Sequence, residues 1–156
     1  MEVVNEHRGS AHATGARTHR GSCFCGAVQV SVEGDPVATG YCHCESCRTW
    51  SASPVNAFTL WHPGAVMVTR GQNNIAVFNK TPRSFRKWCK TCGGHLFTEH
   101  PEMGLIDVYA STIADFPFRA QVHINYQETT LRIADGLPKL KDLPKEMGGS
   151  GIALPE

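Results

Sequence analysis

The seven cysteines of this chain fall into three clusters, which are Cys23 with Cys25, Cys42 with Cys44 and Cys47, and Cys89 with Cys92. In an extended strand alternate side chains share a face, so a Cys-x-Cys pair presents both sulfurs to one ion. A Cys-x-x-Cys pair does the same across a tight turn. The spacing therefore predicts that each cluster is a zinc-binding half-site.

Glycines suggest which half-sites combine. Gly26 follows the first cluster and Gly93 and Gly94 follow the third, whereas the middle cluster runs directly into Arg48. Glycine permits the tight backbone turn of a metal knuckle. We therefore pair the first and third clusters as a closed four-cysteine site, which is typical of structural zinc, although spacing alone leaves other pairings open. The middle cluster has three ligands and an open fourth position, which is typical of a site that binds or transforms a ligand.

A disulfide framework is the alternative interpretation of clustered cysteines. It fits poorly, because seven is an odd number and because two cysteines one residue apart in a strand cannot easily bridge to each other. The first residues also contain no apolar segment typical of a secretory signal. We therefore expect reduced, metal-binding thiols and a cytoplasmic protein.

Length and charge limit the class of partner. A chain of 156 residues suits one domain with a hydrophobic core of its own. The net charge is +1, and charges of both signs are spread along the sequence, so we expect neither a nucleic-acid nor a membrane partner. These features favour a small-molecule ligand. They leave the oligomeric state open.

The periodicity of the sequence is that of strands. Valines at 28, 30 and 32 alternate with polar residues, as in a half-buried strand. Similar short runs between turn residues predict further strands at 55–61, 65–69, 75–78, 84–88, 95–98, 105–109 and 121–126. We expect an all-β fold, an antiparallel sandwich or open barrel with zinc knuckles, with at most a short helix near 111–115.

The two ends of the chain differ from its centre. Residues 1–20 are rich in histidine and arginine and poor in core-forming residues, which predicts a disordered tail. A basic recognition arm or a targeting peptide is the alternative interpretation of this segment. The zinc-binding β domain is expected to span 21–143, and the glycine-rich segment 144–156 is expected to be flexible.

The ordered motifs resemble a known family. They are Gly21-Ser-Cys-Phe-Cys-Gly-Ala27, Cys42-His-Cys-Glu-Ser-Cys-Arg48, Trp88-Cys-Lys-Thr-Cys-Gly-Gly94 and Ile133-Ala-Asp-Gly-Leu-Pro138. Together they resemble the glutathione-dependent formaldehyde-activating enzymes, a family that also includes centromere protein V. The resemblance implies a β-tent fold and two zinc ions per chain, one structural on Cys23, Cys25, Cys89 and Cys92 and one catalytic on Cys42, Cys44 and Cys47.

The resemblance also implies an activity. The named reaction of the family joins formaldehyde and glutathione into S-hydroxymethylglutathione, so this chain is expected to be a carbon-sulfur lyase acting on glutathione or another small thiol and on formaldehyde or a related aldehyde. A zinc centre with three thiolates is soft and suits a fourth sulfur better than hydroxide. The alternatives are a zinc-binding glutathione carrier and a protein-interaction module without catalysis. A zinc deaminase is a poor match, because no Pro-Cys-x-x-Cys motif is present.

Several polar residues near the clusters could have a role. His43 alternates with Cys42 and Cys44, so in a strand it should face away from their metal and be solvated or hydrogen-bonded. Arg48 could bind a substrate carboxylate, balance the anionic zinc centre or form a surface ion pair. The basic residues of the segment 80–87 could hold the carboxylates of a tripeptide or form the solvated face of a hairpin; they are Lys80, Arg83, Arg86 and Lys87.

Overall fold

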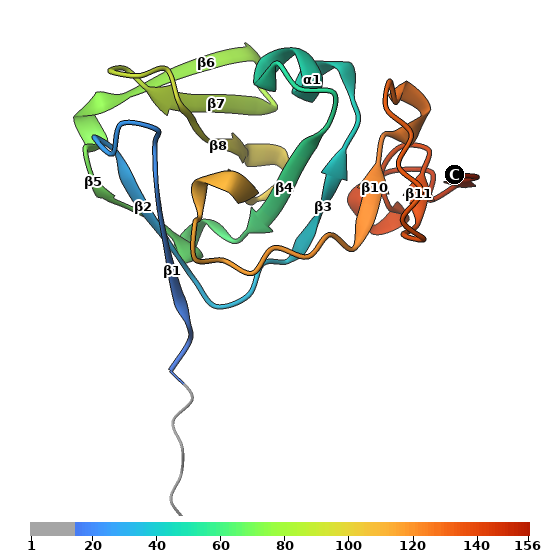
Figure 1. The fold of residues 1–156 in the computed structure, drawn as a ribbon, viewed down its shortest axis with the longest axis horizontal. Helices are drawn as coiled ribbons and strands as arrows, with labels where there is room; N and C mark the ends of the chain where they lie inside the picture. Colours follow the sequence, from blue (N-terminus) through green and yellow to red (C-terminus); the bar gives the residue numbers. More distant parts are fainter. Residues whose placement is uncertain (1–14) are drawn as a thin grey trace, which may run out of the picture.

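The computed structural model describes residues 15–156 and confirms the all-β class. Its strands form two sheets, one of three strands in the order β1-β2-β5 and one of nine in the order β12-β11-β10-β3-β4-β9-β8-β7-β6 (Figure 1). The strands are β1 (Thr18–Ser22), β2 (Gln29–Glu33), β3 (Ala38–Cys42), β4 (Asn56–Trp61), β5 (Val66–Arg70), β6 (Ile75–Thr81), β7 (Ser84–Cys89), β8 (His95–His100), β9 (Leu105–Tyr109), β10 (Val122–Ile124), β11 (Lys139–Leu140) and β12 (Ala153–Leu154).

The main core lies between the two sheets. Val28 and the β2 valines Val30 and Val32 turn inward, as their alternation predicts, and meet Trp61 and Val108 of the larger sheet. A second apolar cluster lies on the other face of the larger sheet and contains Cys42, Phe58, Leu60 and Leu105. Strand β4 serves both clusters, because successive side chains of a strand point to opposite faces. The middle cysteine cluster therefore belongs to the second core.

Strand pairing is antiparallel with one exception. Strand β10 runs parallel to both β3 and β11, which differs from the purely antiparallel sheet that we expected. Strands β9 and β10 run in the same direction, and the long connection between them returns the chain to the end of the sheet at which β9 began. Strand β10 therefore enters the sheet parallel to β3. It places the segment after β10 beside the end of β3, where Cys42 lies.

One α-helix is present in the described part of the chain. Helix α1 (Glu45–Ser51) follows β3, whereas sequence periodicity predicts no helix there. None of its seven residues is fully buried, so it lacks the apolar stripe on which such a prediction depends. The helix expected near 111–115 is instead a 3₁₀ turn, η4 (Ala110–Thr112). The other short 3₁₀ segments are η1 (Pro63–Ala65), η2 (Gln72–Asn74), η3 (Pro101–Met103), η5 (Tyr126–Glu128) and η6 (Lys145–Met147).

The ends of the chain are more ordered than expected where the structure describes them. Thr18 to Arg20 belong to β1 and not to a tail, because backbone pairing with β2 needs no apolar side chains. The expected tail before Gly15 lies outside the described residues. The segment 144–156 contains η6 and β12, and β12 pairs with β11, so it is part of the fold and not a loose end. Its ordering comes from backbone pairing and charge contacts that glycine content does not reveal.

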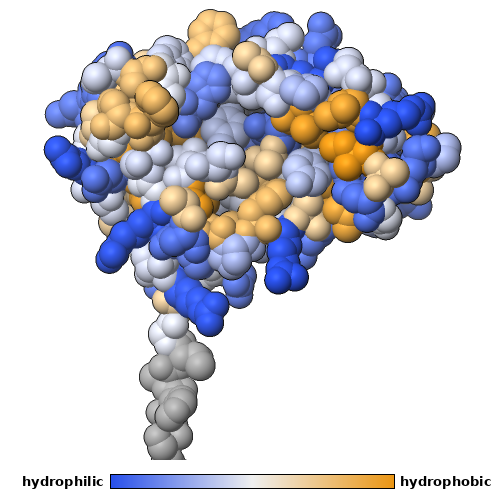
Figure 2. Space-filling view, viewed as in Figure 1, coloured by the Kyte–Doolittle hydropathy of each residue, from blue (hydrophilic) through white to orange (hydrophobic). Residues whose placement is uncertain are grey.

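The surface shows apolar residues in separate patches among hydrophilic ones (Figure 2). The most exposed large apolar residues of the described chain are Phe24, Met67 and Phe78, at 95%, 64% and 52% exposure. Among the described residues, no helix has the length and apolar character needed to cross a membrane.

Candidate metal centres

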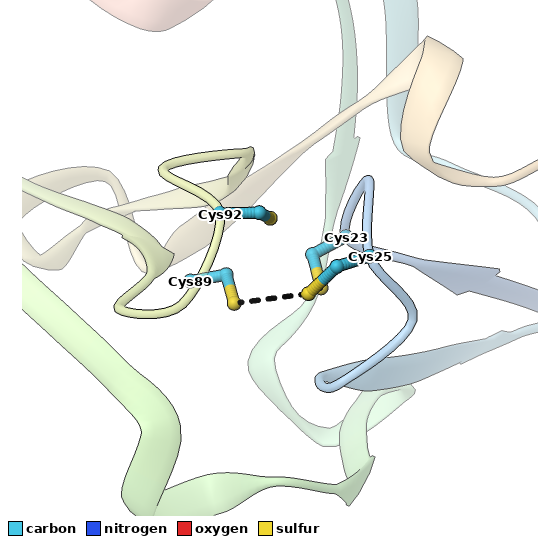
Figure 3. A group of neighbouring side chains, drawn as sticks. All are labelled: Cys23, Cys25, Cys89 and Cys92. Atoms are coloured by element: carbon cyan, nitrogen blue, oxygen red, sulfur yellow. Dashed lines mark hydrogen bonds between the residues drawn. The ribbon is translucent and has the colours of Figure 1, made fainter.

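The four-cysteine cluster joins two turns from different sheets. Cys23 and Cys25 lie in the turn between β1 and β2, whereas Cys89 ends β7 and Cys92 lies in the turn that follows it; Figure 3 shows the four side chains. All four sulfurs lie within 4.8 Å of one another. The Sγ atoms of Cys23 and Cys25 are 3.7 Å apart, and those of Cys25 and Cys89 are 3.9 Å apart. Tetrahedral zinc with Zn–S bonds of about 2.3 Å has S···S edges of about 3.8 Å, so these sulfurs fit the ion.

Several N–H groups point at these sulfurs. The backbone N–H of Val28 donates to Cys23 Sγ at 3.3 Å, and Asn74 Nδ2 donates to Cys89 Sγ at 3.2 Å. The backbone N–H of Gly94 donates to Cys92 Sγ at 3.4 Å, and such bonds lower the pKa of Cys92 to about 6. Donors of this kind stabilise thiolate, the form that binds metal.

Gly94 is needed for close approach. A Cβ at this position would lie 3.1 Å from the backbone nitrogen of Phe24 and 3.2 Å from Cys92 Sγ. Either contact is tighter than ordinary packing allows. The glycine therefore lets the β7–β8 turn meet the β1–β2 turn at the cluster.

The three-cysteine cluster is built from one short segment. Cys42 ends β3, Cys44 is the N-cap of α1 and Cys47 lies in its first turn. Their sulfurs also lie within 4.8 Å of one another. The backbone N–H of Cys47 donates to Cys44 Sγ at 3.3 Å, as a capping side chain requires, and Asn125 Nδ2 donates to Cys42 Sγ at 3.5 Å. The helix start that sequence periodicity missed is thus what turns the third sulfur toward the other two.

The three thiols of this cluster differ widely in pKa. Hydrogen bonds with Cys42 and then with Cys47 lower the pKa of Cys44 to about 2, and the nearby Arg86 charge lowers it further. The same contact with Cys44 raises the pKa of Cys42 to about 12, and contacts with both neighbours raise the pKa of Cys47. The cluster therefore prefers a single shared negative charge in the absence of another cation. A soft divalent cation would supply the charge that lets all three ionise.

His43 faces away from the sulfurs, as its place between two cysteines predicts. It is fully buried and not solvated, at 0% exposure. Its Nε2 lies 2.8 Å from Nδ1 of His123, and its Nδ1 lies 2.7 Å from Oγ1 of Thr129. Burial and then the neighbouring His123 lower the pKa of His43 to about 4, so its ring is neutral at pH 7. The hydrogen-bonded role is therefore the one that the structure supports.

The contacts of His43 extend to the last residue of the chain. His123 Nε2 lies 2.9 Å from Asp135 Oδ2, and Lys139 Nζ lies 2.5 Å from Asp135 Oδ1 and 2.6 Å from Glu156 Oε1. Lys139 is 2% exposed. No pattern in the sequence assigns a role to these four residues, which we call, together with His43 and Thr129, the polar relay. The motif at 133–138 contained the one available signal, because Asp135 lies within it.

Comparison with known proteins identifies the family. A family model described as glutathione-dependent formaldehyde-activating enzyme matches residues 18–142. The chain belongs to this family. The formaldehyde-activating family match spans all seven cysteines and His43, His123, Asp135 and Lys139, and confirms the resemblance drawn from the motifs.

Curated relatives carry related names. A Schizosaccharomyces pombe protein named "Uncharacterized lyase" is 29% identical over 79 residues, which cover 51% of this chain and 56% of that protein. An Emericella nidulans protein named "Putative glutathione-dependent formaldehyde-activating enzyme" is 28% identical over 89 residues, which cover 53% of this chain and 45% of that protein. The chain spans about half the length of these relatives.

A solved structure shares the fold. A crystal structure of a Rhodobacter sphaeroides protein superposes with a TM-score of 0.53 at 19% identity, covering 62% of this chain and 89% of that one. At this identity the likeness concerns the fold alone.

The basic residues at 48 and 80–87 that the sequence offered as substrate contacts have different surroundings. Arg48 is half-buried, and its Nε donates to the carbonyl oxygen of His43 at 2.9 Å, so it braces the cysteine loop from inside. Arg86 is 8% exposed and donates to Ser46 Oγ at 2.9 Å. Lys87 forms an ion pair with Glu99. Lys80 and Arg83 are exposed, as the solvated-face interpretation predicts.

Proposed function

We propose that this chain is a zinc-dependent carbon-sulfur lyase that joins a small thiol, with glutathione the leading candidate, to formaldehyde or a related aldehyde, or cleaves the product. Cys23, Cys25, Cys89 and Cys92 would hold a structural zinc ion, and Cys42, Cys44 and Cys47 a catalytic one. Family membership and the names of the relatives support the reaction class. Sulfur-only donor sets support zinc.

The observation that carries this proposal is the inequality of the two clusters. All seven cysteines are used, and they divide into four and three. A structural site alone would not need a second set of three sulfurs that is only partly buried, with Cys44 and Cys47 half-exposed. Zinc bound there would offer a further coordination position suited to a sulfur ligand and would favour its thiolate form.

The reaction balances without another reagent. The substrate thiol loses its proton, its sulfur forms a bond to the carbonyl carbon, and the C=O π pair moves to the oxygen, which takes up a proton. The product is the S-hydroxymethyl adduct, and the reverse steps regenerate thiol and aldehyde. The protein's task is to hold the two reactants together and to favour the ionised thiol.

The residues around the loop keep it in place for this task. Arg48 holds the carbonyl of His43, and the polar relay holds the imidazole of His43. Because His43 lies between Cys42 and Cys44, fixing it fixes the spacing of both sulfurs. Arg86 adds a positive charge near Cys44 that favours thiolate over thiol.

Arg48 remains our proposed contact for a substrate carboxylate. Its Nε is engaged with the His43 carbonyl, but a guanidinium carries four further N–H donors on its two terminal nitrogens. These can pair with a carboxylate without releasing the loop.

Exchange spectroscopy tests the function directly. Formaldehyde and glutathione equilibrate without a catalyst, so the measured quantity is the exchange rate between free and S-hydroxymethyl glutathione by NMR, with and without zinc-loaded protein. We expect a faster exchange that disappears in Cys44→Ser. Binding of glutathione without faster exchange would support the carrier, and neither binding nor exchange would support the interaction module.

A further inference from the structure

Two buried donors near the three-cysteine cluster have no partner. Within residues 15–156, the buried side-chain nitrogens without a hydrogen-bond partner are Trp50 Nε1 and Asn56 Nδ2. Asn56 is 7% exposed. Native proteins satisfy almost all buried polar groups, so an unpaired donor calls for a physical explanation. An acceptor bound beside them would supply that explanation.

Both donors flank the cluster. Asn56 lies directly opposite Cys42 in the antiparallel pairing of β3 with β4, and directly opposed residues place their side chains on the same face of the sheet. Trp50 lies on α1, three residues after Cys47. Its ring stacks on His95 with the centroids 4.3 Å apart.

A cavity of about 320 Å³ opens at this place. It lies between the loop after α1, the start of β4 and the end of β9, and it is lined by Asn56, His95, Tyr109, Ser51, Ser53 and Thr112 among others. Its volume is in the range of small-ligand sites. Asn56, which lines the cavity and lies opposite Cys42, connects the cavity to the three-cysteine cluster.

The lining mixes apolar surface with neutral polar groups and carries no fixed charge. Amide, hydroxyl, phenol and imidazole groups surround the cavity, and no lysine, arginine, aspartate or glutamate lines it. A carboxylate would lack a counter-charge there, whereas a neutral oxygen needs only a donor. The hydroxyl of Tyr109 is hydrogen-bonded to Thr98 at 2.8 Å, whereas Asn56 Nδ2 is buried and has no partner.

We propose that this cavity receives the neutral oxygen of the aldehyde or of the hydroxymethyl adduct, and that Asn56 Nδ2 donates a hydrogen bond to it. The assignment rests on the proposed function and adds a substrate-contacting residue to it. As the S–C bond forms, the C=O π pair moves to this oxygen, where a preorganised donor has its largest effect. The χ2 torsion of asparagine has a broad, two-fold distribution. A rotation of about 180° about χ2 exchanges the positions of the amide oxygen and nitrogen, and so can turn Nδ2 toward the cavity without changing the space that the side chain fills.

The test uses Asn56→Leu, which keeps the size of the side chain and removes the donor. Asn73→Leu is the matched control, because Asn73 is exposed and lies in η2, away from the cavity. Two glutathione thioethers of equal size, S-(2-hydroxyethyl)glutathione and S-propylglutathione, serve as probes that differ in one hydroxyl. Affinities come from titration calorimetry, exchange rates from NMR and melting temperatures from calorimetry.

We expect wild type and Asn73→Leu to prefer the hydroxyethyl ligand by about five- to tenfold, the value of one hydrogen bond, and Asn56→Leu to show no preference. The exchange rate of Asn56→Leu should fall by about 10²-fold, as for loss of one oxyanion donor. Its melting temperature should stay equal or rise by about 2–4 °C, because an unpaired buried donor is removed.

Each other outcome has a defined meaning. A melting temperature several degrees lower in Asn56→Leu would make Asn56 a structural residue and overturn the inference. So would equal affinities of wild type for the two thioethers, or an exchange rate within twofold of wild type in the variant, while the proposed function would stand in both cases. Wild type that neither accelerates exchange nor binds any glutathione derivative would overturn the proposed function and the inference with it.

Discussion

The two cysteine clusters use the same ligand atom but connect very different parts of the chain. The four-cysteine cluster ties a turn of the three-stranded sheet to a turn of the nine-stranded sheet, and Cys25 and Cys89 are 64 residues apart. The three-cysteine cluster lies within residues 42–47. A cross-link that closes a long loop removes much more chain entropy than one that closes a few residues. Metal at the first site should therefore stabilise the whole fold, and metal at the second should affect mainly its own loop.

The two clusters also differ in the groups that hold their cysteines in place. The four-cysteine cluster is held by backbone donors close to its own turns, with the exception of Asn74. The three-cysteine loop is held instead by the polar relay, which runs from the buried His43 to the exposed Glu156. A local site that is to bind and release a ligand needs such external support, because its metal contributes little to the fold.

The largest expected effect is on folding. Cys92 and Cys44 are a matched pair, since both are half-buried and both accept a backbone N–H at the sulfur. Loss of a structural metal belongs to the changes that cost about 4 kcal/mol or more, so Cys92→Ser should lower the melting temperature of the zinc-loaded protein by about 10 °C or more. Cys44→Ser should lower it by less than about 5 °C. Equal losses in calorimetry would contradict the division into a structural and a functional site.

The second prediction concerns activity and reverses the order of the same two residues. Cys44→Ser should reduce the thiol–aldehyde exchange rate by about 10²-fold or more. Mutation of a residue that only hydrogen-bonds to a metal ligand already costs about 10–100-fold in metal affinity or activity. Thr49→Ala is the control on α1, because Thr49 is exposed and bonds only within the helix. An active Cys44→Ser protein would place the chemistry elsewhere.

The third prediction tests the relay. Lys139→Met removes the buried cation of the relay and leaves the partly exposed carboxylates of Asp135 and Glu156, so it should lower the free energy of unfolding by more than the loss of a surface ion pair does. The zinc affinity of the three-cysteine site should fall by about tenfold, while that of the four-cysteine site should not change. Urea unfolding and chelator competition measure the two effects.

Lys87→Met is the control for this change. It breaks the more exposed pair with Glu99, and such pairs contribute about 0–1 kcal/mol. If both variants lowered the affinities of the two zinc sites alike, the relay would stabilise the fold without selecting the three-cysteine loop.

Much of the four-cysteine cluster could be predicted from the sequence because its signals are local. Glycines after Cys25 and Cys92 mark the two turns, and the alternation of Val28, Val30 and Val32 marks a strand beside one of them. The pairing of the two turns followed from their likeness, and the structure brings all four sulfurs together.

The support of the three-cysteine loop could not be predicted in the same way. A lysine, two histidines and an aspartate are ordinary surface residues by composition, and only pairing in the folded state makes the burial of Lys139 and His123 favourable. The start of α1 was missed for a related reason, since its N-cap is the thiol of Cys44 and not one of the usual capping side chains. Each of these features depends on a contact between residues distant in the sequence or unusual in type.

The smallest expected effect concerns whether water reaches the apolar core beside the three-cysteine cluster. Asp107 lies opposite Leu60, a member of that core, and burial raises the pKa of Asp107 to about 7, although the Thr59 N–H and Arg86 act against this. An unfolded aspartate has a pKa of about 3.9, so the folded protein binds this proton more tightly. Its stabilising contribution is therefore present at low pH and lost as pH rises toward 7.

Asp107→Asn keeps the oxygen that accepts from Thr59 at 3.2 Å and removes the titration. Relative to this variant, wild type should lose about 2 kcal/mol of unfolding free energy between pH 5 and 7. Urea unfolding of both proteins over this range measures the difference. Parallel curves would mean that water reaches Asp107, and a wild type that gains stability with pH would mean that the Arg86 charge outweighs burial on this side of the sheet.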